Sequence, residues 1–218
     1  MPYTPMMLQY LEVKEKYKNE ILFYRLGDFY EMFFDDAVTV SRELELTLTG
    51  KSCGTEERAP MCGVPFHSAE TYIARLVKKG YTVVVCEQME DPATAKGLVK
   101  RDVVRIITPG TVTESVMLTE GKNNYLCALY ISGTCAGICF ADISTAKVYV
   151  TQINDGDVNN RIINELATYL PSEIITNADR TGVKEIFEYA RDRIGVKESF
   201  FGRRLRRTLH AFRKRPAR

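Results

Sequence analysis

Phe29 and Glu31 form the most informative pair in the sequence, and they lie within the stretch Gly27-Asp28-Phe29-Tyr30-Glu31. The ring can make apolar contacts and the carboxylate can accept hydrogen bonds. The apolar run Ile21–Leu26 before them is short, aromatic-rich and followed by Gly-Asp, which predicts a buried strand. The residues after them repeat at helical spacing, which predicts a helix over about 29–45. A strand, a tight turn and a helix would together present both side chains at the helix start.

Phe29 also has a purely structural interpretation. It extends an apolar stripe at helical spacing that runs on to Leu44, so it could be a core aromatic. Tyr30 and Phe34, however, form a second stripe about 100° away on the same helix. Because one helix face cannot bury all of these rings, the sequence is also compatible with an exposed Phe29.

Longer motifs along the first half of the chain occur in the same order in one known family. They are Thr4-Pro5-Met6-Met7, Phe23-Tyr24-Arg25-Leu26-Gly27-Asp28-Phe29-Tyr30-Glu31, Gly63-Val64-Pro65-Phe66-His67, Cys86-Glu87-Gln88 with Asp91-Pro92-Ala93-Thr94, and Val104-Arg105-Ile106-Ile107-Thr108-Pro109-Gly110-Thr111. With these motifs the chain resembles the amino-terminal part of the MutS DNA mismatch-repair proteins, from about Thr4 to about Phe201. Several long motifs in family order are far more specific than one short pattern.

The resemblance implies that Phe29 and Glu31 read defects in base pairing. In that family the Phe of a Phe-x-Glu motif wedges beside a mispaired or unpaired base, and the Glu hydrogen-bonds that base. An apolar wedge suits this role because it unstacks a base step and kinks the duplex. A mismatch lowers the cost because its pairing is already poor, so discrimination would come from deformability more than from a base code.

Glu31 has an alternative role that the sequence alone leaves open. It lies three residues after Asp28, which is the spacing of a capping box with Asp28 as the N-cap. The helix dipole also favours a carboxylate at that position. Facing DNA, the same carboxylate would be repelled by phosphates and makes sense only as a partner for a base edge. The two roles could alternate, with a cap in the free protein and a base contact on DNA.

The remaining candidate binding residues are a short segment and a set of cations. Met61 and Gly63 belong to the segment Met61–His67, which in the family lies beside the reader motif, and which otherwise reads as a strand and turn before an N-cap. The basic side chains that could contact phosphates, or could equally be ordinary solvated charges, are Arg25, Lys51, Arg58, Arg75, Lys96 and Arg105.

The net charge of +2 conceals an uneven distribution. Residues 199–218 contain eight Lys or Arg and no Asp or Glu, whereas residues 1–112 contain 14 basic and 16 acidic residues. Phosphate contacts normally dominate DNA affinity, so we expect the first 112 residues alone to bind DNA weakly unless their cations cluster. The basic segment 203–218 predicts a disordered tail or an amphipathic basic helix, and it makes a general nucleic-acid binder an alternative function.

The cysteines and acidic residues give weak support to a metal or disulfide site. Six cysteines occur without a secretory signal, without a Cys-x-x-Cys pair and with only two histidines, so buried free thiols are expected and zinc is poorly supported. Asp142 stands on a predicted strand where a ribonuclease-H-like nuclease keeps a metal-binding carboxylate. A two-metal site needs several converging carboxylates, and no convincing set accompanies Asp142. We therefore interpret Asp142 as structural, and a small metal-dependent nuclease remains an alternative function.

The order of elements predicts a mixed α/β protein with two domains. We expect a mixed-sheet mismatch-recognition domain with flanking helices at 1–112, a linker at 113–122, a partial ribonuclease-H-like connector domain at 123–201 and a basic tail at 202–218. The predicted elements are a helix opened by Thr4-Pro5, strands at 47–49, 81–86 and 103–108, a loop at 50–60, a helix capped by Ser68, a meander of strands at 124–131, 137–143 and 147–153, helices at 158–170 and 183–193, and a strand at 173–176. The connector pattern fails after about residue 201, which we interpret as a truncated or altered carboxyl end.

The sequence predicts a binding protein that is not itself an enzyme. It contains no Gly-x-x-x-x-Gly-Lys-[Ser/Thr] phosphate loop, so we expect no cofactor in this chain. ATP and Mg²⁺, a second MutS chain and a MutL protein are implied only for the full-length proteins of the family. No stretch suits a signal peptide or a membrane span, so we expect a cytoplasmic protein whose partner is mismatched double-stranded DNA.

Overall fold

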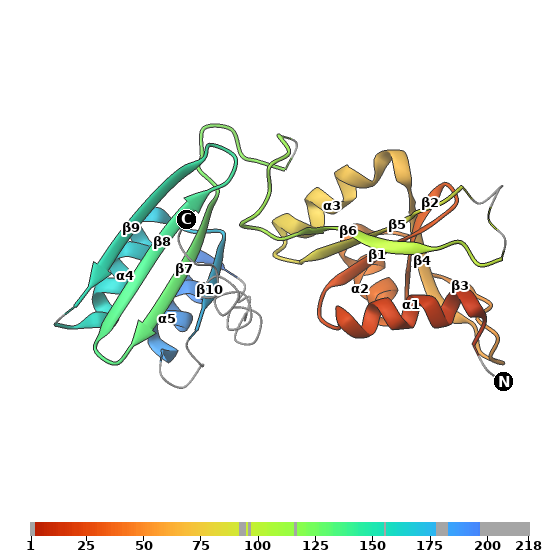
Figure 1. The fold of residues 1–218 in the computed structure, drawn as a ribbon, viewed down its shortest axis with the longest axis horizontal. Coiled ribbons are helices and arrows are strands. Elements are labelled where there is room, and N and C mark those ends of the chain that lie inside the picture. Colours follow the sequence, from red (N-terminus) through yellow and green to blue (C-terminus); the bar gives the residue numbers. More distant parts are fainter. Residues whose placement is uncertain are drawn as a thin grey trace, which may run out of the picture. The chain divides into compact units, whose positions relative to one another are not determined.

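The computed structural model of the chain describes residues 3–91, 95, 97–115, 117–154, 156–177 and 183–196. The chain divides into two compact units (Figure 1). The part up to Thr108 is called the first unit, and the part from Pro109 onward is called the second unit. Lys96 and the basic tail at 202–218 lie outside the described residues. No helix in the described part of the chain is long and apolar enough to cross a membrane.

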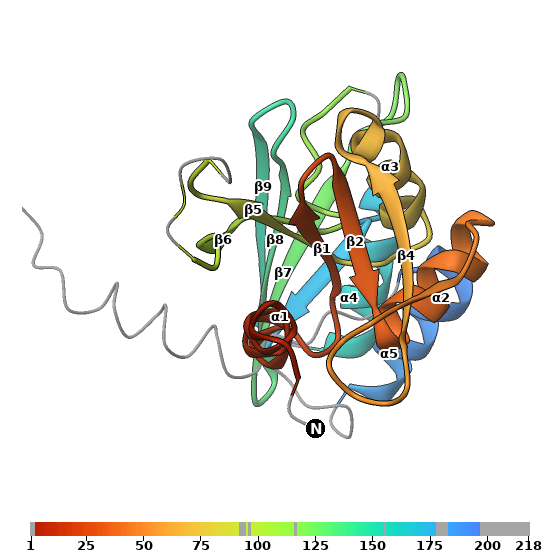
Figure 2. The ribbon, with the colours of Figure 1, turned by 90° about the vertical axis from the view of Figure 1, so that its right-hand side faces the viewer.

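The first unit is built on a six-stranded sheet with the order β3-β4-β2-β1-β5-β6. Its elements are α1 (Pro5–Lys16), β1 (Ile21–Leu26), β2 (Phe29–Phe33), α2 (Phe34–Leu44), β3 (Thr49–Lys51), β4 (Ala59–Pro65), the 3₁₀ turn η1 (Phe66–Ser68), α3 (Ala69–Lys78), β5 (Val83–Gln88) and β6 (Arg101–Ile107). Only β1 and β5 pair in parallel, and the other neighbours are antiparallel. The predicted mixed sheet is therefore confirmed. Figure 2 shows β4, β2 and β1 side by side.

Helices cover both faces of this sheet. On one face, the α1 face, Met7 and Tyr10 of α1 pack against Tyr24 and Phe33 in a buried cluster. The other face carries α2 and α3, and it is therefore called the α2–α3 face. In Figure 1, α3 lies above β5 and β6, and α1 lies below them. The helix start at Thr4-Pro5 is as predicted, because the Thr4 hydroxyl accepts a hydrogen bond from the Met7 N–H at 3.4 Å.

The prediction of a helix over 29–45 is wrong at its start. Phe29–Phe33 is strand β2, which pairs with β1 in a hairpin, and helix α2 begins only at Phe34. A hairpin forms here in place of the predicted helix because Gly27 adopts a φ of +58° in a two-residue loop, and because aromatic side chains are favoured on a pleated strand. The helical stripe is real only from residue 37 onward. The capping-box interpretation of Glu31 is also wrong, since Glu31 lies within the strand.

Smaller differences occur around β3 and α3. The short strand is Thr49–Lys51 rather than 47–49, and β4 already begins at Ala59, inside the predicted loop. Ser68 occupies the N-cap position of α3, as predicted, but its hydroxyl donates to the Pro65 carbonyl at 3.2 Å rather than accepting from the helix. These local pairings depend on the neighbouring strand, which a local sequence pattern does not contain.

The second unit is a four-stranded sheet with the order β10-β7-β8-β9. Its elements are β7 (Tyr125–Ser132), β8 (Cys135–Asp142), β9 (Lys147–Ile153), α4 (Val158–Tyr169), β10 (Glu173–Thr176), α5 (Lys184–Tyr189) and the π-helix η2 (Ala190–Ile194). β7, β8 and β9 form an antiparallel meander, and β10 joins β7 in parallel. This confirms the predicted succession of three strands, a helix and a fourth strand.

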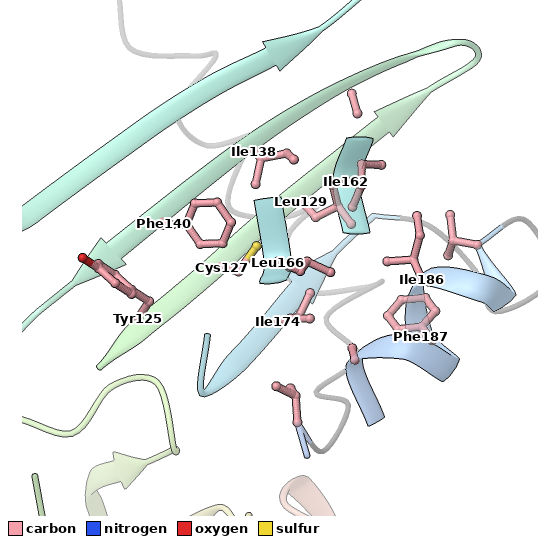
Figure 3. Close-up of a cluster of buried hydrophobic side chains, with 14 of the residues drawn as sticks. Tyr125, Cys127, Leu129, Ile138, Phe140, Ile162, Leu166, Ile174, Ile186 and Phe187 are labelled. Atoms are coloured by element: carbon pink, nitrogen blue, oxygen red, sulfur yellow. The ribbon is translucent and has the colours of Figure 1, made fainter. Parts of the chain in front are cut away.

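The core of the second unit lies on one face of its sheet. Figure 3 shows Cys127, Phe140 and Ile174 on the strands pointing toward Leu166 of α4 and Phe187 of α5. Alternate residues point to the opposite face, where Val150 is 76% exposed. Among the described residues, no helix contributes to a core on that opposite face.

Candidate nucleic-acid interface

Phe29 lies at the tip of the β1–β2 hairpin, directly after the two-residue loop Gly27-Asp28. Its side chain is 47% exposed, whereas Tyr30, Met32 and Phe33 in the same strand are buried. The tip is fixed to the neighbouring strand, because the Asp28 carbonyl accepts a hydrogen bond from the Phe66 N–H at 2.9 Å. The hairpin therefore holds a large apolar ring in solvent on a well-supported backbone.

Phe66 is a second exposed aromatic side chain beside the hairpin tip. It follows Pro65, which is the register partner of Phe29, and it is 42% exposed. Phe66 was not among the predicted site residues, although it belongs to the motif Gly63-Val64-Pro65-Phe66-His67. A usable signal was its position between a strand and an N-cap, where an aromatic side chain has no core stripe to join.

Arg25 links the hairpin to two other segments. Its guanidinium carbon lies 3.8 Å from the Phe66 ring centroid, and its Nη1 lies 3.7 Å from Glu87 Oε1. Its Nε donates to the Gly27 carbonyl. The Tyr30 hydroxyl donates a hydrogen bond to the same Glu87 carboxylate. The pKa of Tyr30 is raised to about 12, mainly by burial and secondly by this hydrogen bond. Arg25 thus lies on the α2–α3 face, packed and paired. Phe29 and Phe33 lie at alternate positions of β2, and Phe33 belongs to the α1-face cluster, so Phe29 projects from the opposite, α1 face.

Glu31 lies on the same face of the sheet as Phe29, two residues along β2. Its Oε2 lies 2.5 Å from Nζ of Lys51 on β3, so this predicted phosphate contact has a carboxylate partner. Gly63 is the register partner of Glu31 on β4, between the two charged residues. The sheet order brings together three predicted site residues that are far apart in the sequence.

Gly63 and Met61 contribute space and packing to this face. A methyl group at position 63 would lie 3.3 Å from the Tyr30 carbonyl oxygen and 3.6 Å from Glu31 Cγ, so the site is closely packed. Met61 is partly buried against the α1-face cluster, and its carbonyl accepts from the Thr49 hydroxyl at 3.0 Å. Gly63 therefore lies directly under the candidate base contact, whereas Met61 supports the strand.

The other predicted cations do not gather in one place. Arg105 forms an ion pair with Glu70 of α3, with Nη1 2.9 Å from Oε1, which places it on the α2–α3 face. Arg58 donates to the Gly50 carbonyl at the β3–β4 end of the sheet, and Arg75 is exposed on α3. Lys96 lies outside the described residues. Arg25 on β1 is the predicted cation nearest to β2 in the sheet, but it lies on the opposite face from Phe29 and Glu31. Lys51 on β3 is the predicted cation that reaches Glu31 itself.

Asp142 and the cysteines have structural environments. The Asp142 carboxylate accepts hydrogen bonds from Ser144, Thr145 and Asn124 at the end of β8, and although burial alone would raise its pKa, these bonds lower it. Within the described residues, no group of three or more His, Cys, Asp and Glu side chains could hold a metal ion. Four of the six thiols are buried, and all six are free.

Comparisons with known proteins give consistent matches along the chain. A family model described as MutS domain I matches residues 4–116, and one described as MutS domain II matches residues 124–213, into the basic tail. The DNA mismatch repair protein MutS of Ruminiclostridium cellulolyticum is 58% identical over 198 residues, which cover 91% of this chain and 23% of that protein.

Two further relatives carry the same printed name. That of Acetivibrio thermocellus is 57% identical over 203 residues, with 91% of this chain and 23% of the relative covered. That of Clostridioides difficile is 54% identical over 198 residues, with 90% of this chain and 20% of the relative covered. The chain thus spans less than a quarter of the length of these curated relatives.

Proposed function

Because this chain belongs to the MutS family, we propose that its first unit recognises mispaired or unpaired bases in duplex DNA, with Phe29 as the wedge and Glu31 as the base contact. The observation that carries this proposal is the exposure of Phe29, which is 47% exposed in a strand whose other aromatic residues are buried. A large exposed ring on a rigid hairpin costs the folded protein apolar burial and is available for insertion into a base stack.

The energies involved make such a wedge selective. Burying a phenylalanine side chain contributes about 1.5–3 kcal/mol, and unstacking one base step costs a few kcal/mol. The two terms nearly cancel on a matched duplex, so insertion there gains little. At a mismatch or bulge part of the unstacking and unpairing cost is already spent, and insertion of Phe29 becomes favourable.

Glu31 would then supply a polar contact beside the wedge. Phe29 and Glu31 project from the same face of β2 at alternate positions, so both can meet one distorted base pair. A carboxylate oxygen accepts a hydrogen bond from a base N–H, and a paired base in an intact duplex has that N–H occupied. The contact therefore favours bases whose normal pairing is lost.

Phosphate contacts in this proposal are few, and affinity depends strongly on salt. Arg58 and Arg75 remain candidates, because neither forms an ion pair among the described residues. Each phosphate contact contributes a slope of about −0.9 in the logarithm of affinity against the logarithm of salt concentration. We expect weak binding that is measurable at low salt. ATP hydrolysis, pairing with a second chain and binding of MutL we assign to the remainder of a full-length protein.

Fluorescence anisotropy at low salt tests the proposal. The probes are a matched duplex, a duplex with one G·T pair and a duplex with a one-base bulge. The proteins are the wild type, Phe29→Ala, and Tyr130→Ala as a matched loss of an exposed aromatic side chain in the second unit. We expect a preference for the two defective duplexes that Phe29→Ala removes and Tyr130→Ala retains. Equal binding of the wild type to all three duplexes would overturn the proposal.

A further inference from the structure

Lys51 and Glu31 form a tight, half-buried ion pair at the candidate interface. Nζ of Lys51 lies 2.5 Å from Oε2 of Glu31, and the side chains are 32% and 14% exposed. Within the described residues, Lys51 is the one cation at ion-pair distance from Glu31. A pair withdrawn from solvent in this way is screened less by salt than a pair on the open surface.

The fold places this pair across an intervening strand. β2 and β3 flank β4 in the sheet, and neighbouring strands are about 4.8 Å apart. The two side chains must therefore reach over β4 to meet. Gly63 on β4 lies beneath this crossing, and a methyl group there would be in ordinary contact with Glu31 Cγ at 3.6 Å and crowded against the Tyr30 carbonyl oxygen at 3.3 Å.

The pair leaves half of the carboxylate available. Oε2 contacts Lys51, whereas Oε1 has no hydrogen-bond partner among the described residues. A carboxylate without a nearby cation would be repelled by the phosphates of any duplex. With Lys51 beside it, the pair carries no net charge and is not repelled by the DNA phosphates. One carboxylate oxygen can still accept a hydrogen bond from a base.

From this geometry we propose that Lys51 is the positioning residue of the Glu31 base contact and not a phosphate contact. Lys51 neutralises the carboxylate and orients its free oxygen. The inference rests on the proposed function, since it assigns Lys51 a role in the same reading site. It separates Lys51 from Arg58, the neighbouring cation, which has no carboxylate partner among the described residues.

A double-mutant cycle on DNA binding distinguishes the two roles. The full chain is prepared as wild type, Lys51→Met, Glu31→Gln and the double variant, and binding to the G·T duplex is measured by anisotropy. Lys51→Met leaves a charged group uncompensated, so we expect about a tenfold loss with Glu31 present and less than about a twofold loss in the Glu31→Gln background. Lys51→Arg, which keeps the charge, restores most of the affinity.

Arg58→Met is the matched control, measured in the same two backgrounds. Removing a simple phosphate contact lowers affinity by one factor in both backgrounds and reduces the salt slope by about 1. Lys51→Met is expected to leave the salt slope unchanged in the Glu31→Gln background. An equal loss in both backgrounds, together with a reduced salt slope, would overturn the proposal and make Lys51 a phosphate contact.

A second cycle without DNA keeps the inference separate from the proposed function. If the wild type binds all three duplexes equally, the proposed reading function fails. The inference about Lys51 can still be tested, by measuring the urea unfolding of the same four proteins. Lys51→Met is expected to lower the unfolding midpoint when Glu31 is present and to leave it nearly unchanged in the Glu31→Gln background. Equal lowering in both backgrounds would show that Lys51 does not hold Glu31, and would overturn the inference on its own.

Discussion

The two units expose apolar side chains in different ways. In the first unit both sheet faces carry helices, and Phe29 is exposed at a hairpin tip, beyond the part of the face that α1 covers. In the second unit helices pack on one face, and a whole row of strand residues, including Val150, faces solvent. The exposed ring of Phe29, the Lys51–Glu31 ion pair and Phe66, on which Arg25 stacks, are the features on which the proposed binding site rests. An exposed sheet face indicates by itself only that nothing in the described residues packs there.

The largest effect on stability is expected in the second unit, on the face of the sheet that the helices cover. Phe140 is buried and stacks on Tyr169 of α4, with ring centroids 4.2 Å apart. Phe140→Ala is expected to destabilise the second unit by about 3–5 kcal/mol because it removes a large core side chain. Urea unfolding of the full chain, with hydrogen exchange to assign the transition to the second unit, measures this. A loss below about 1 kcal/mol would mean that the covered face is not the core.

An effect of intermediate size is expected at alkaline pH, which should lower the stability of the first unit more than that of the second. Burial raises the pKa of Cys86 to about 11, and it raises the pKa of Cys62 and of Tyr24 to about 12. The folded first unit keeps these protons at pH values at which the unfolded chain releases them. The stability that these buried groups contribute is therefore fully present below about pH 8.5, the ordinary thiol pKa, and this contribution is lost as pH rises toward 11–12.

The second unit should respond less to the same pH change. Its described groups with a raised pKa are Cys127, at about 12, and Tyr125. Pulse proteolysis in urea at pH 7 and pH 10, with mass spectrometry to assign the cleaved unit, compares the two midpoints. We expect both to fall and the midpoint of the first unit to fall further. A first-unit midpoint that rises with pH would contradict the assigned burial.

A smaller effect is expected at the hairpin loop. Gly27 has a φ of +58°, which an L side chain adopts only with strain, although nothing else lies within 4 Å of a methyl group there. Gly27→Ala is expected to cost about 1 kcal/mol of stability and to weaken mismatch preference by moving Phe29. Gly137→Ala is the matched control, because that glycine has equal space and an ordinary φ, and it should be close to neutral. Equal costs at both positions would show that the loop conformation is not what holds Phe29.

The smallest effect is expected on the open face of the second unit. Val150 is 76% exposed, so Val150→Thr keeps the β-branched shape and removes little buried apolar area. The change in the free energy of unfolding should stay within about 0.5 kcal/mol. Measured beside Phe140→Ala, a loss above about 2 kcal/mol would mean that this face is packed and that the contrast between the units is smaller than described.

The sequence predicted the elements better than it predicted their pairing. The strand at Ile21–Leu26 and the meander of the second unit followed from apolar runs bounded by turn residues. The strand at Phe29–Phe33 was missed because Phe33 also begins a helical stripe, and a local pattern could not decide between the two periods. The Gly-Asp loop, which closes the hairpin, was the signal that favoured a strand.

The candidate site divides in the same way. Phe29 and Glu31 could be named from their motif, and the structure places both on one face of β2. The Glu31–Lys51 pair could not be predicted, because it joins residues twenty positions apart through the strand order β3-β4-β2. Phe66 likewise becomes a neighbour of Phe29 only through the register of β2 and β4. Long-range sheet pairing is what the sequence pattern does not contain.

The most direct test of the central claim asks whether Phe29 enters the base stack. A fluorescent adenine analogue, 2-aminopurine, is placed beside a G·T pair, and its emission is recorded with saturating protein. Unstacking by a wedge increases this emission, so we expect an increase with the wild type and none with Phe29→Ala at equal saturation. An equal increase with Phe29→Ala, or no increase with the wild type when binding is complete, would contradict the account of Phe29 as the wedge.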